Sequence, residues 1–421
     1  MVALQLDFQI MPTEREMLGT LASAVVGGGR IPATIPLSIR LHDTMEPLEQ
    51  SWRALESRNE LSLHQSYDWC KAWIESHDCK PLIVEGVSGG QTHLILPLEI
   101  VRHGPIRTAR FLGSRFSNIN TGLYTDEFRF LAAPPRLRKA LEQARGQFAR
   151  YFDLFLLENM PLTWRGETNS FADLPAVLNQ NASFQLALFP EFERTLAQVN
   201  AKRRRKKFRS TERRLELVGG YEHVIATSAA DGKALLDVFF RQKAARFEAM
   251  GLPNVFRDAE TQDFFHRLTS VVPNEESYPL QLHAVRLKAE HEDKIVAIAG
   301  VSRKGDHVIC QFGSIDDTLV PDASPGEFLF YLIIRQLCSE GVRLFDFGIG
   351  DQPYKRSWCT IETAQHDLLW PTTVAGSTIA AIHRAKAGAK RTIKQNPRLY
   401  SLMQRLRSGK TEFVEVGSDN D

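Results

Sequence analysis

Residues 343–355 contain the side chains that are best suited to catalysis, and their order in the sequence predicts that these side chains lie close together. A strand-like segment, 343–347, ends in the turn Gly348-Ile349-Gly350, and a short polar segment follows. In α/β folds, polar groups at the carboxyl end of a strand often face a ligand. A carboxylate, a phenol and an amine there can bind a polar ligand and exchange protons with it, although a surface turn that supports the fold would look the same. The candidate catalytic residues are Asp346, Tyr354 and Lys355.

The place of Asp346 in its strand restricts what this carboxylate can do. Asp346 alternates with Phe345 and Phe347, so its side chain points to the opposite face of the sheet. Unless Asp346 lines a cleft, it needs a buried hydrogen-bond partner.

A second candidate site lies at the start of a helix, at Ser324-Pro325-Gly326-Glu327. The spacing predicts a capping box, in which Ser324 accepts from the Glu327 amide and Glu327 reaches back to the Ser324 amide. Pro325 suits the first helical position, and Gly326 leaves the first turn open to a ligand. Because a helix N-terminus attracts anions, this turn could receive a phosphate or pyrophosphate. An ordinary capped helix explains the same residues.

The elements that must position these sites repeat along the chain. Each half predicts a strand, two helices, an antiparallel run of strands, a further helix and a further strand. The fold class is therefore α/β (α+β), with two related units of about 150 residues. The predicted organisation is a leader or linker at 1–35, domains at 36–190 and 191–373, and a basic helical tail at 374–421. One face of the tail helix would hold Ile379, Ile382, Ala385, Ala389 and Ile393.

The segment 324–358, SPGEFLFYLIIRQLCSEGVRLFDFGIGDQPYKRSW, resembles the signature of GNAT-type acetyltransferases of the CelD/BcsL family, which is named for cellulose biosynthesis. The shared pattern is an SPG at a helix start, an FDFG-like strand, and a YK followed closely by Trp. Segment 65–73, the LPL within strand 94–99 and the basic run after a mid-chain helix are also similar. The resemblance covers residues 38–372.

The resemblance implies two tandem GNAT-like folds, as in the related Fem-type aminoacyl ligases, each with a mixed, mostly antiparallel sheet flanked by helices. In GNAT enzymes a loop and a helix N-terminus hold the pyrophosphate of acyl-CoA, and the pantetheine arm pairs with the preceding strand, here 306–313. The implied co-substrate is acetyl-CoA or another acyl-CoA, without a metal. The loop DDTLVPDASPG departs from the GNAT pattern R/Q-x-x-G-x-G/A because it has one glycine. The implied cofactor-binding residues are Ser324, Pro325, Gly326, Gly348 and Gly350.

The reaction that the resemblance implies is direct acyl transfer from the thioester to an amine or a hydroxyl. The attacking group must lose a proton, and the leaving thiolate benefits from receiving one. Tyr354 is then the predicted proton donor, and Asp346 is the predicted base or acceptor-positioning residue. Lys355 would hold an anionic group on CoA or on the acceptor.

The formal net charge of the chain, +2, conceals two basic segments. Residues 202–214 hold nine basic residues and one acid, and residues 376–410 hold nine basic residues and no acid. Such segments bind anionic partners, so both could contact an anionic membrane surface or polysaccharide machinery. Segment 202–214 could equally be a solvated helix face. Nucleic acid is a less favoured partner, because Phe208 is the one aromatic residue in that segment.

Composition and motifs exclude several other classes of protein. The five cysteines have irregular spacing and form no CxxC pair, which argues against a disulfide framework or a zinc site and favours a reducing, cytoplasmic compartment. No run of about 18 apolar residues predicts a membrane span, and the first residues lack the pattern of a signal peptide. Asp346-Phe347-Gly348 matches a kinase triplet, but the other kinase motifs are missing.

Three functions remain open at this point. The favoured prediction is an acyl-CoA-dependent N- or O-acyltransferase that acts on a sugar, a polysaccharide precursor or a cell-envelope component. One alternative is a Fem-like ligase that uses aminoacyl-tRNA, with segment 202–214 on the RNA. The other is a non-catalytic protein that binds an anionic surface, at the inner face of the membrane, through segment 376–410.

Overall fold

The helices and strands of the structure lie between Ser38 and Gln395. The predicted leader at 1–35 therefore lies outside the described residues, and so does the end of the predicted tail. The computed structural model describes residues 36–131, 136–271, 276–291 and 294–395.

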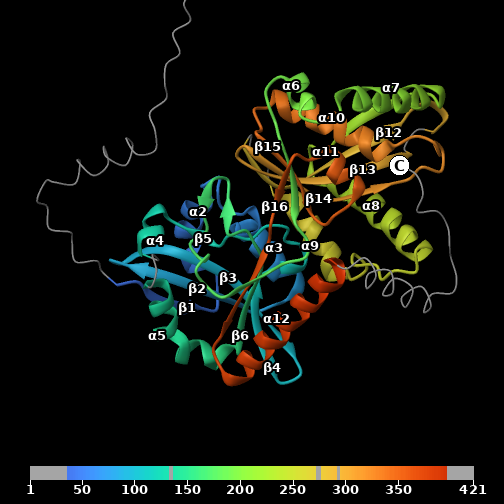
Figure 1. Ribbon diagram of the computed structural model, residues 1–421. Coiled ribbons are helices and arrows are strands. Elements are labelled where there is room, and N and C mark those ends of the chain that lie inside the picture. The colour runs from blue at the N-terminus through green and yellow to red at the C-terminus, as the bar shows by residue number, and fades with distance from the viewer. Residues whose placement is uncertain (1–35, 132–135, 272–275, 292–293, 396–421) are drawn as a thin grey trace, which may run out of the picture. The chain divides into compact units, whose positions relative to one another are not determined.

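The first of two large sheets has the strand order β1-β2-β3-β4-β6-β17-β9, with β5 paired to β3 (Figure 1). Its β4–β6 pair is parallel and its other pairs are antiparallel. The first-half elements are β1 Ser38–His42, α2 Glu49–Glu56, α3 Tyr67–His77, β2 Pro81–Ser88, β3 Gln91–His103, β4 Ile106–Phe111, β5 Leu123–Tyr124, α4 Asp126–Leu131, α5 Arg136–Tyr151, β6 Leu154–Met160, the hairpin β7 Thr163–Trp164 and β8 Glu167–Thr168, and β9 Ala176–Leu178.

The second sheet has the order β11-β12-β13-β14-β15-β10-β16 and repeats the plan of the first. Its β14–β15 pair is parallel and its other pairs are antiparallel. The predicted fold class is thereby confirmed. The remaining elements are β10 Ser183–Ala187, α6 Phe192–Ala197, α7 Ala201–Leu217, β11 Tyr221–Ile225, α8 Ala229–Ala249, α9 Ala259–Ser270, β12 Ser277–Leu287, β13 Ile295–Lys304, β14 His307–Ile315, α10 Pro325–Ser339, β15 Leu344–Ile349, α11 Pro353–Trp358, β16 Ile361–Thr363, β17 His366–Pro371 and α12 Val374–Gln395.

The two sheets exchange strands. β10 lies before the expected domain boundary near residue 190, yet it pairs with β15 and β16 of the second sheet. β17 lies within the expected second domain, 191–373, yet it pairs with β6 and β9 of the first sheet. The sheets therefore do not divide where the predicted ranges 36–190 and 191–373 meet.

An aromatic cluster packs the two halves against each other through α3 and α9. The ring of Phe264 on α9 lies 5.2 Å from Trp69 and 5.2 Å from Trp73 on α3. Phe116 stacks on Phe264 at 6.2 Å. These rings belong to a single hydrophobic core that extends into both halves, so the second sheet is held on the first by apolar burial.

The tail helix is confirmed from residue 374 to 395, but its predicted apolar face is partly wrong. Ile382 is 44% exposed, whereas Ala380 is fully buried against β17 and β6. A Cβ on Gly376 would lie 1.7 Å from the Asp153 carbonyl oxygen, so only a glycine allows the helix to approach this closely. The packed face therefore depends on small residues, which the search for large apolar residues overlooked. Among the described helices, none has the length and apolar character that a membrane crossing requires.

Candidate functional site

The parallel strands β14 and β15 part midway along their length. Their pairing ends at Ile309 and Asp346, although β14 continues to Ile315 and β15 to Ile349. On its other edge β15 pairs with β10. Beyond the last pair, the facing edges of the two strands have no ladder bonds to each other, so their backbone groups can pair with an extended ligand.

β14 also carries an extra residue, Gln311, at this point. Against β13, Val301 pairs with Cys310 and Gly300 pairs with Phe312, so Gln311 has no partner of its own in the ladder. A bulge of this kind leaves backbone groups unpaired and redirects a side chain. Parting strands and a bulge together therefore interrupt the ladder of β14 in the middle of the sheet.

The side chain of Gln311 reaches residues of the first half. Asn118 Nδ2 donates to Gln311 Oε1 at 3.2 Å, and His64 Nε2 lies 3.3 Å from the same oxygen. Gln311 Nε2 donates to Ser302 Oγ at 3.0 Å. Burial lowers the pKa of His64 to about 4, so this imidazole is neutral near pH 7. The first half thus helps to fix the bulge, and the sequence analysis singled out none of these polar side chains for the site.

The predicted helix start is present, but the predicted capping box is wrong. α10 begins with Pro325 at its first position, and the Ser324 side chain makes no capping hydrogen bond. Glu327 instead forms ion pairs with Arg204 and with Lys207, the latter at 3.0 Å. Two cations from α7 attract this carboxylate more strongly than a neutral amide does. They also offset its negative charge beside the helix N-terminus.

Gly326 lies where the first turn of α10 meets the end of β14. A Cβ at this position would lie 3.0 Å from Ile315 Cγ2, closer than ordinary van der Waals contact. The helix N-terminus thus sits directly beside the segment of β14 that has parted from β15, where its partial positive charge favours an anion. The preceding loop opposes this effect with the carboxylates of Asp316, Asp317 and Asp322.

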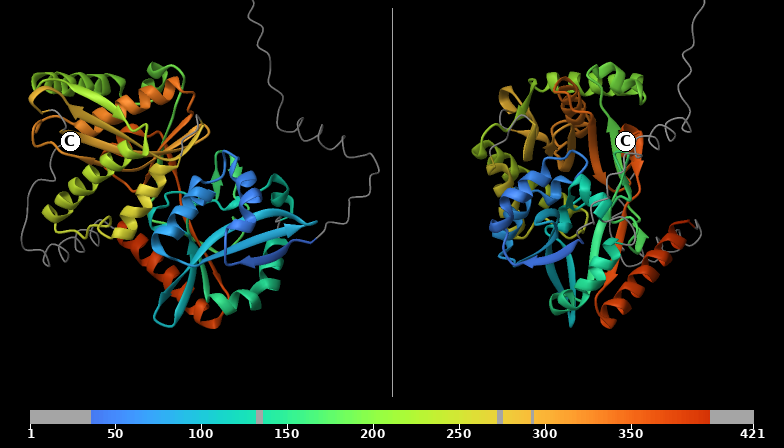
Figure 2. Two further views of the ribbon diagram at one scale, coloured as in Figure 1. Left: turned by 180° about the vertical axis from the view of Figure 1, so that it is seen from behind. Right: turned by 90° about the vertical axis from the view of Figure 1, so that its left-hand side faces the viewer.

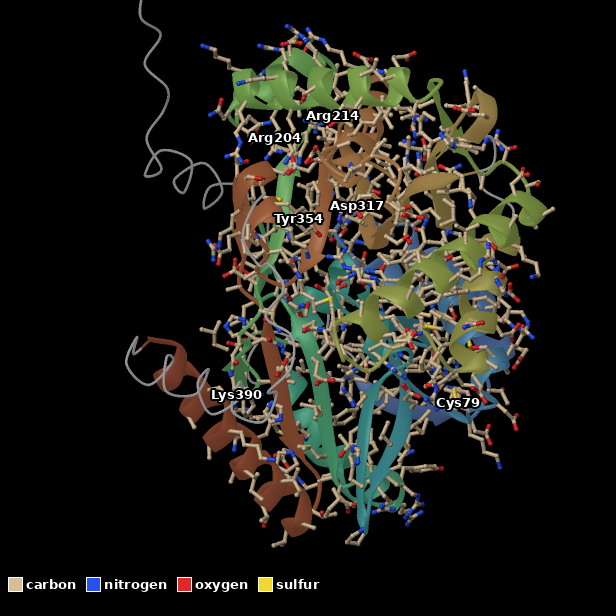
Figure 3. The ribbon with its side chains drawn as sticks, turned by 90° about the vertical axis from the view of Figure 1, so that its right-hand side faces the viewer. Cys79, Arg204, Arg214, Asp317, Tyr354 and Lys390 are labelled. Atoms are coloured by element: carbon tan, nitrogen blue, oxygen red, sulfur yellow. The ribbon has the colours of Figure 1, made fainter. Side chains whose placement is uncertain are left out.

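Arg204 connects α7, α10 and α11. Its guanidinium is 5% exposed, pairs with Glu327 on α10 and donates to Ser357 Oγ on α11. It also lies 4.1 Å from the centre of the Trp358 ring. Ser357 Oγ in turn donates to the Tyr354 carbonyl at 2.7 Å. Figure 3 shows Arg204 at the underside of α7, on the side of Tyr354. Sequence reasoning treated Arg204 as one of a run of cations and missed this role.

Tyr354 lies on α11, the short helix that follows β15. Its ring stacks on Phe330 with centroids 5.9 Å apart and an interplanar angle of 9°, and it touches Phe347 edge-on. Burial, with a smaller contribution from the thiols of Cys310 and Cys359, raises the pKa of Tyr354 well above the ordinary value of 10. The phenol therefore keeps its proton near pH 7 and is uncharged there.

Lys355 and the two glycines stabilise the turn after β15. Lys355 is buried, and its Nζ donates to the carbonyl oxygens of Ile349 at 2.7 Å and Gly348 at 3.3 Å. Burial lowers the pKa of this amine. Gly348 and Gly350 have φ of 73° and 105°, and a Cβ on Gly348 would lie 2.8 Å from Asn118 Oδ1. The turn therefore requires glycine for its backbone conformation and its close contact with the first half.

Asp346 is fully buried, and it has the buried hydrogen-bond partners that its position in the strand predicted. One carboxylate oxygen accepts from Gln185 Nε2 at 3.1 Å, and the other accepts from the Gly348 amide at 2.6 Å. His307 Nε2 lies 3.7 Å from the first oxygen. Asp346 therefore holds β10 and the Gly348 turn in place.

The predicted site residues thus fall into two linked groups. Asp346, Lys355 and Gly348 form one network around the turn after β15, and Tyr354 precedes Lys355 on α11. The residues at 324–326 lie at the start of α10, and Arg204 joins the two groups. Within the described residues, no cluster of His, Cys, Asp or Glu could hold a metal ion.

A protein-family model described as "Acetyltransferase (GNAT) domain" matches residues 202–356. The matched segment contains both groups of site residues, from Arg204 to Lys355. This match confirms the prediction of a GNAT-type acyltransferase enzyme, and GNAT domains use acetyl-CoA or another acyl-CoA. No curated protein sequence matches the chain.

Solved structures share the fold at low sequence identity. The crystal structure of FemX is 12% identical, with a TM-score of 0.56, and the match covers 79% of this chain and 97% of FemX. A conserved protein of unknown function from Bacteroides thetaiotaomicron VPI-5482 is 10% identical, with a TM-score of 0.50 and coverage of 79% and 99%. A tandem GNAT protein from the clavulanic acid biosynthesis pathway is 12% identical, with a TM-score of 0.44 and coverage of 80% and 99%. The first two similarities extend over both halves of the chain.

Proposed function

We propose that this chain is an acyl-CoA-dependent N- or O-acyltransferase of the CelD/BcsL type. Its acceptor would be a sugar, a polysaccharide precursor or another cell-envelope component, and its location would be the cytoplasm. The observation that carries the proposal is the parting of β14 and β15 directly beside the N-terminus of α10. An extended pantetheine arm needs a free strand edge, and a pyrophosphate needs a helix N-terminus.

Acyl-CoA would bind with its pyrophosphate at Ser324, Pro325 and Gly326 and its pantetheine arm along the free edge of β14. Lys207 and Arg204 favour this arrangement, because they offset the charge of Glu327 in the first turn. The thioester would then lie near the Gln311 bulge. Backbone amides freed by a bulge can stabilise the negative charge that develops on a thioester carbonyl oxygen.

In the proposed reaction an amine or hydroxyl of the acceptor attacks the thioester carbonyl carbon. The new C–N or C–O bond forms, the C–S bond breaks, and the electron pair of that bond leaves on the thiolate. Tyr354 donates its proton to the thiolate, and the proton of the acceptor passes to solvent and restores the phenol. Because its pKa is raised, the phenol holds a proton near pH 7, and its donation to the thiolate depends on the placement of the hydroxyl beside the sulfur.

Asp346 and Lys355 are proposed as positioning residues. Both carboxylate oxygens of Asp346 already accept hydrogen bonds from the protein, and the Lys355 amine is bound to two carbonyl oxygens. Together they hold the turn at Gly348 and the start of α11, which carries Tyr354. They would therefore affect the rate through the placement of Tyr354.

A thermal-shift comparison of acetyl-CoA, longer acyl-CoAs and free CoA tests this proposal. Stabilisation by an acyl-CoA at concentrations well above its Kd is expected, because a ligand that binds only the folded state raises the melting temperature. No stabilisation by any acyl-CoA or CoA would overturn the proposal. Salt-sensitive binding of aminoacyl-tRNA in its place would favour the Fem-like ligase.

A further inference from the structure

Helix α7 has an inner face that is fully engaged with the protein. Arg204 and Lys207 pair with Glu327, and the ring of Phe208 stacks on those of Phe328, at 4.6 Å, and Tyr331, at 4.2 Å. This face packs α7 on α10. The cations on it are therefore engaged by Glu327, and Arg204 is buried.

The outer face of α7 carries an uncompensated row of cations. Lys202, Lys206, Arg209 and Arg213 are spaced four, three and four residues apart, so they lie on one side of the helix. All four are exposed, and none has a carboxylate partner among the residues that the structure describes. We call these four residues the α7 stripe. It extends over twelve residues, from 202 to 213, or about 16 Å along the helix axis.

We propose that the α7 stripe docks this protein on an anionic phospholipid surface. The stripe is a straight row on a convex outer helix, which suits a flat partner, and Figure 3 shows nitrogen-tipped side chains of α7 directed away from the rest of the chain. The helix ends at Leu217, which is 85% exposed, and a basic helix with an exposed apolar side chain is typical of interfacial binding. Single-stranded RNA fits this face less well, because Phe208 is turned inward and leaves no ring for base stacking.

If α7 docks on a membrane, the described part of the second basic segment, on α12, cannot contact that membrane at the same time. In all views α7 and α12 lie at opposite ends of the unit that contains them (Figures 1 and 2). Among the α12 side chains that the structure describes, the exposed cations are Arg384, Lys386 and Lys390. A flat bilayer in contact with α7 therefore cannot reach these three residues. The proposal concerns α7 alone and does not depend on acyl transfer.

Co-sedimentation of the full chain with vesicles tests the proposal. Vesicles of phosphatidylcholine alone are compared with vesicles that also contain phosphatidylserine, at low and at high salt. Each cation near an anionic leaflet strengthens binding about fivefold. We expect salt-sensitive binding to the phosphatidylserine vesicles only, and at least a tenfold loss when the stripe is neutralised as Lys202→Gln, Lys206→Gln, Arg209→Gln and Arg213→Gln.

A matched control neutralises four exposed cations that lie outside α7, as Lys80→Gln, Arg102→Gln, Lys139→Gln and Lys294→Gln. It has the same net charge as the stripe variant but keeps the α7 stripe, so it should bind like the wild type. Circular dichroism verifies that both variants fold, and Leu217→Ser should weaken binding without any change in charge. Equal binding by the two quadruple variants, or no binding of the wild type, would overturn the proposal. Stripe-dependent binding of tRNA without vesicle binding would overturn it in favour of RNA.

Discussion

The proposed chemistry depends most on the hydroxyl of Tyr354. The ring is held by Phe330 and Phe347, and the helix that carries it is tied to Arg204 through Ser357. These contacts involve the ring and the backbone and leave the hydroxyl to act on a ligand. Removal of the hydroxyl should therefore change the chemistry without changing the fold.

We expect Tyr354→Phe to lower the rate of CoA release from acetyl-CoA by about a hundredfold or more, as is typical for the loss of a general acid. The affinity for acetyl-CoA should stay the same, because the ring keeps its packing. Release of the free thiol, followed with a colorimetric thiol reagent in the presence of the acceptor, measures the rate. Tyr331→Phe, also in the second half, serves as the control. Equal rates for Tyr354→Phe and the wild type would remove Tyr354 as the proton donor.

At the scale of elements, α7 determines how α10 and α11 meet. Arg204 is the shared contact, because its guanidinium pairs with Glu327, donates to Ser357 and covers the Trp358 ring. A buried cation with several partners contributes more than a surface pair of the same charges. The site therefore relies on a helix that carries no proposed catalytic residue.

Arg204→Met should lower the free energy of unfolding by about 2 kcal/mol, because a largely buried carboxylate loses one of its two partners. It should also lower the rate of acyl transfer through misplacement of Tyr354. Arg205→Met is the matched control, since the pair between Arg205 and Glu193 is 37% and 66% exposed. Urea denaturation compares the two variants. The same stability for both would contradict the role assigned to Arg204.

The sequence predicted the elements of the site better than the contacts between them. The start of α10 was predictable because Pro325 and Gly326 mark a helix N-terminus locally. The ion pair of Arg204 with Glu327 was not, since it joins residues 123 positions apart. The predicted capping box failed for the same reason, as it considered only the residues next to Glu327. The Gln311 bulge was also missed, because it depends on register against β13.

At the scale of the whole molecule, the two sheets hold each other's strands. The repeated order of elements predicted two similar units. It did not predict which sheet β10 joins, because this strand has only five residues and its sequence does not distinguish the two sheets. Gln185 on β10 donates a hydrogen bond to Asp346. β17, in turn, pairs with β6 of the first sheet. The second half, which carries the proposed site, therefore needs a strand that lies before residue 191, its expected start.

Lys304 adds a polar connection between the halves. Its buried Nζ, on β13, donates to the backbone carbonyl oxygens of Leu61, at 2.7 Å, and Arg58 in the first half. Burial lowers the pKa of Lys304 to about 7 from the ordinary value of 10.5. Between these two pH values the unfolded chain binds the proton and the folded chain does not, so this residue makes the free energy of unfolding rise with pH.

Lys304→Met should remove that pH dependence. From pH 7 to pH 9, the gain in the free energy of unfolding should be larger for the wild type than for the variant by about 2–3 kcal/mol. Urea denaturation at both pH values measures the difference, and Lys294→Met, at an exposed position, is the control. If all three proteins share the same pH slope, Lys304 is not buried as a neutral amine.

The central claim is that the N-terminus of α10 holds the pyrophosphate of acyl-CoA, and calorimetric titration with acetyl-CoA tests it most directly. The comparison uses the wild type, Gly326→Glu and the control Gly146→Glu, whose helical position is open to solvent. Gly326→Glu adds a negative charge and a side chain at the first turn of α10, while circular dichroism verifies the fold. The account predicts binding by the wild type and by Gly146→Glu and at least a hundredfold loss for Gly326→Glu. Full affinity in folded Gly326→Glu, or no binding by the wild type, would contradict it.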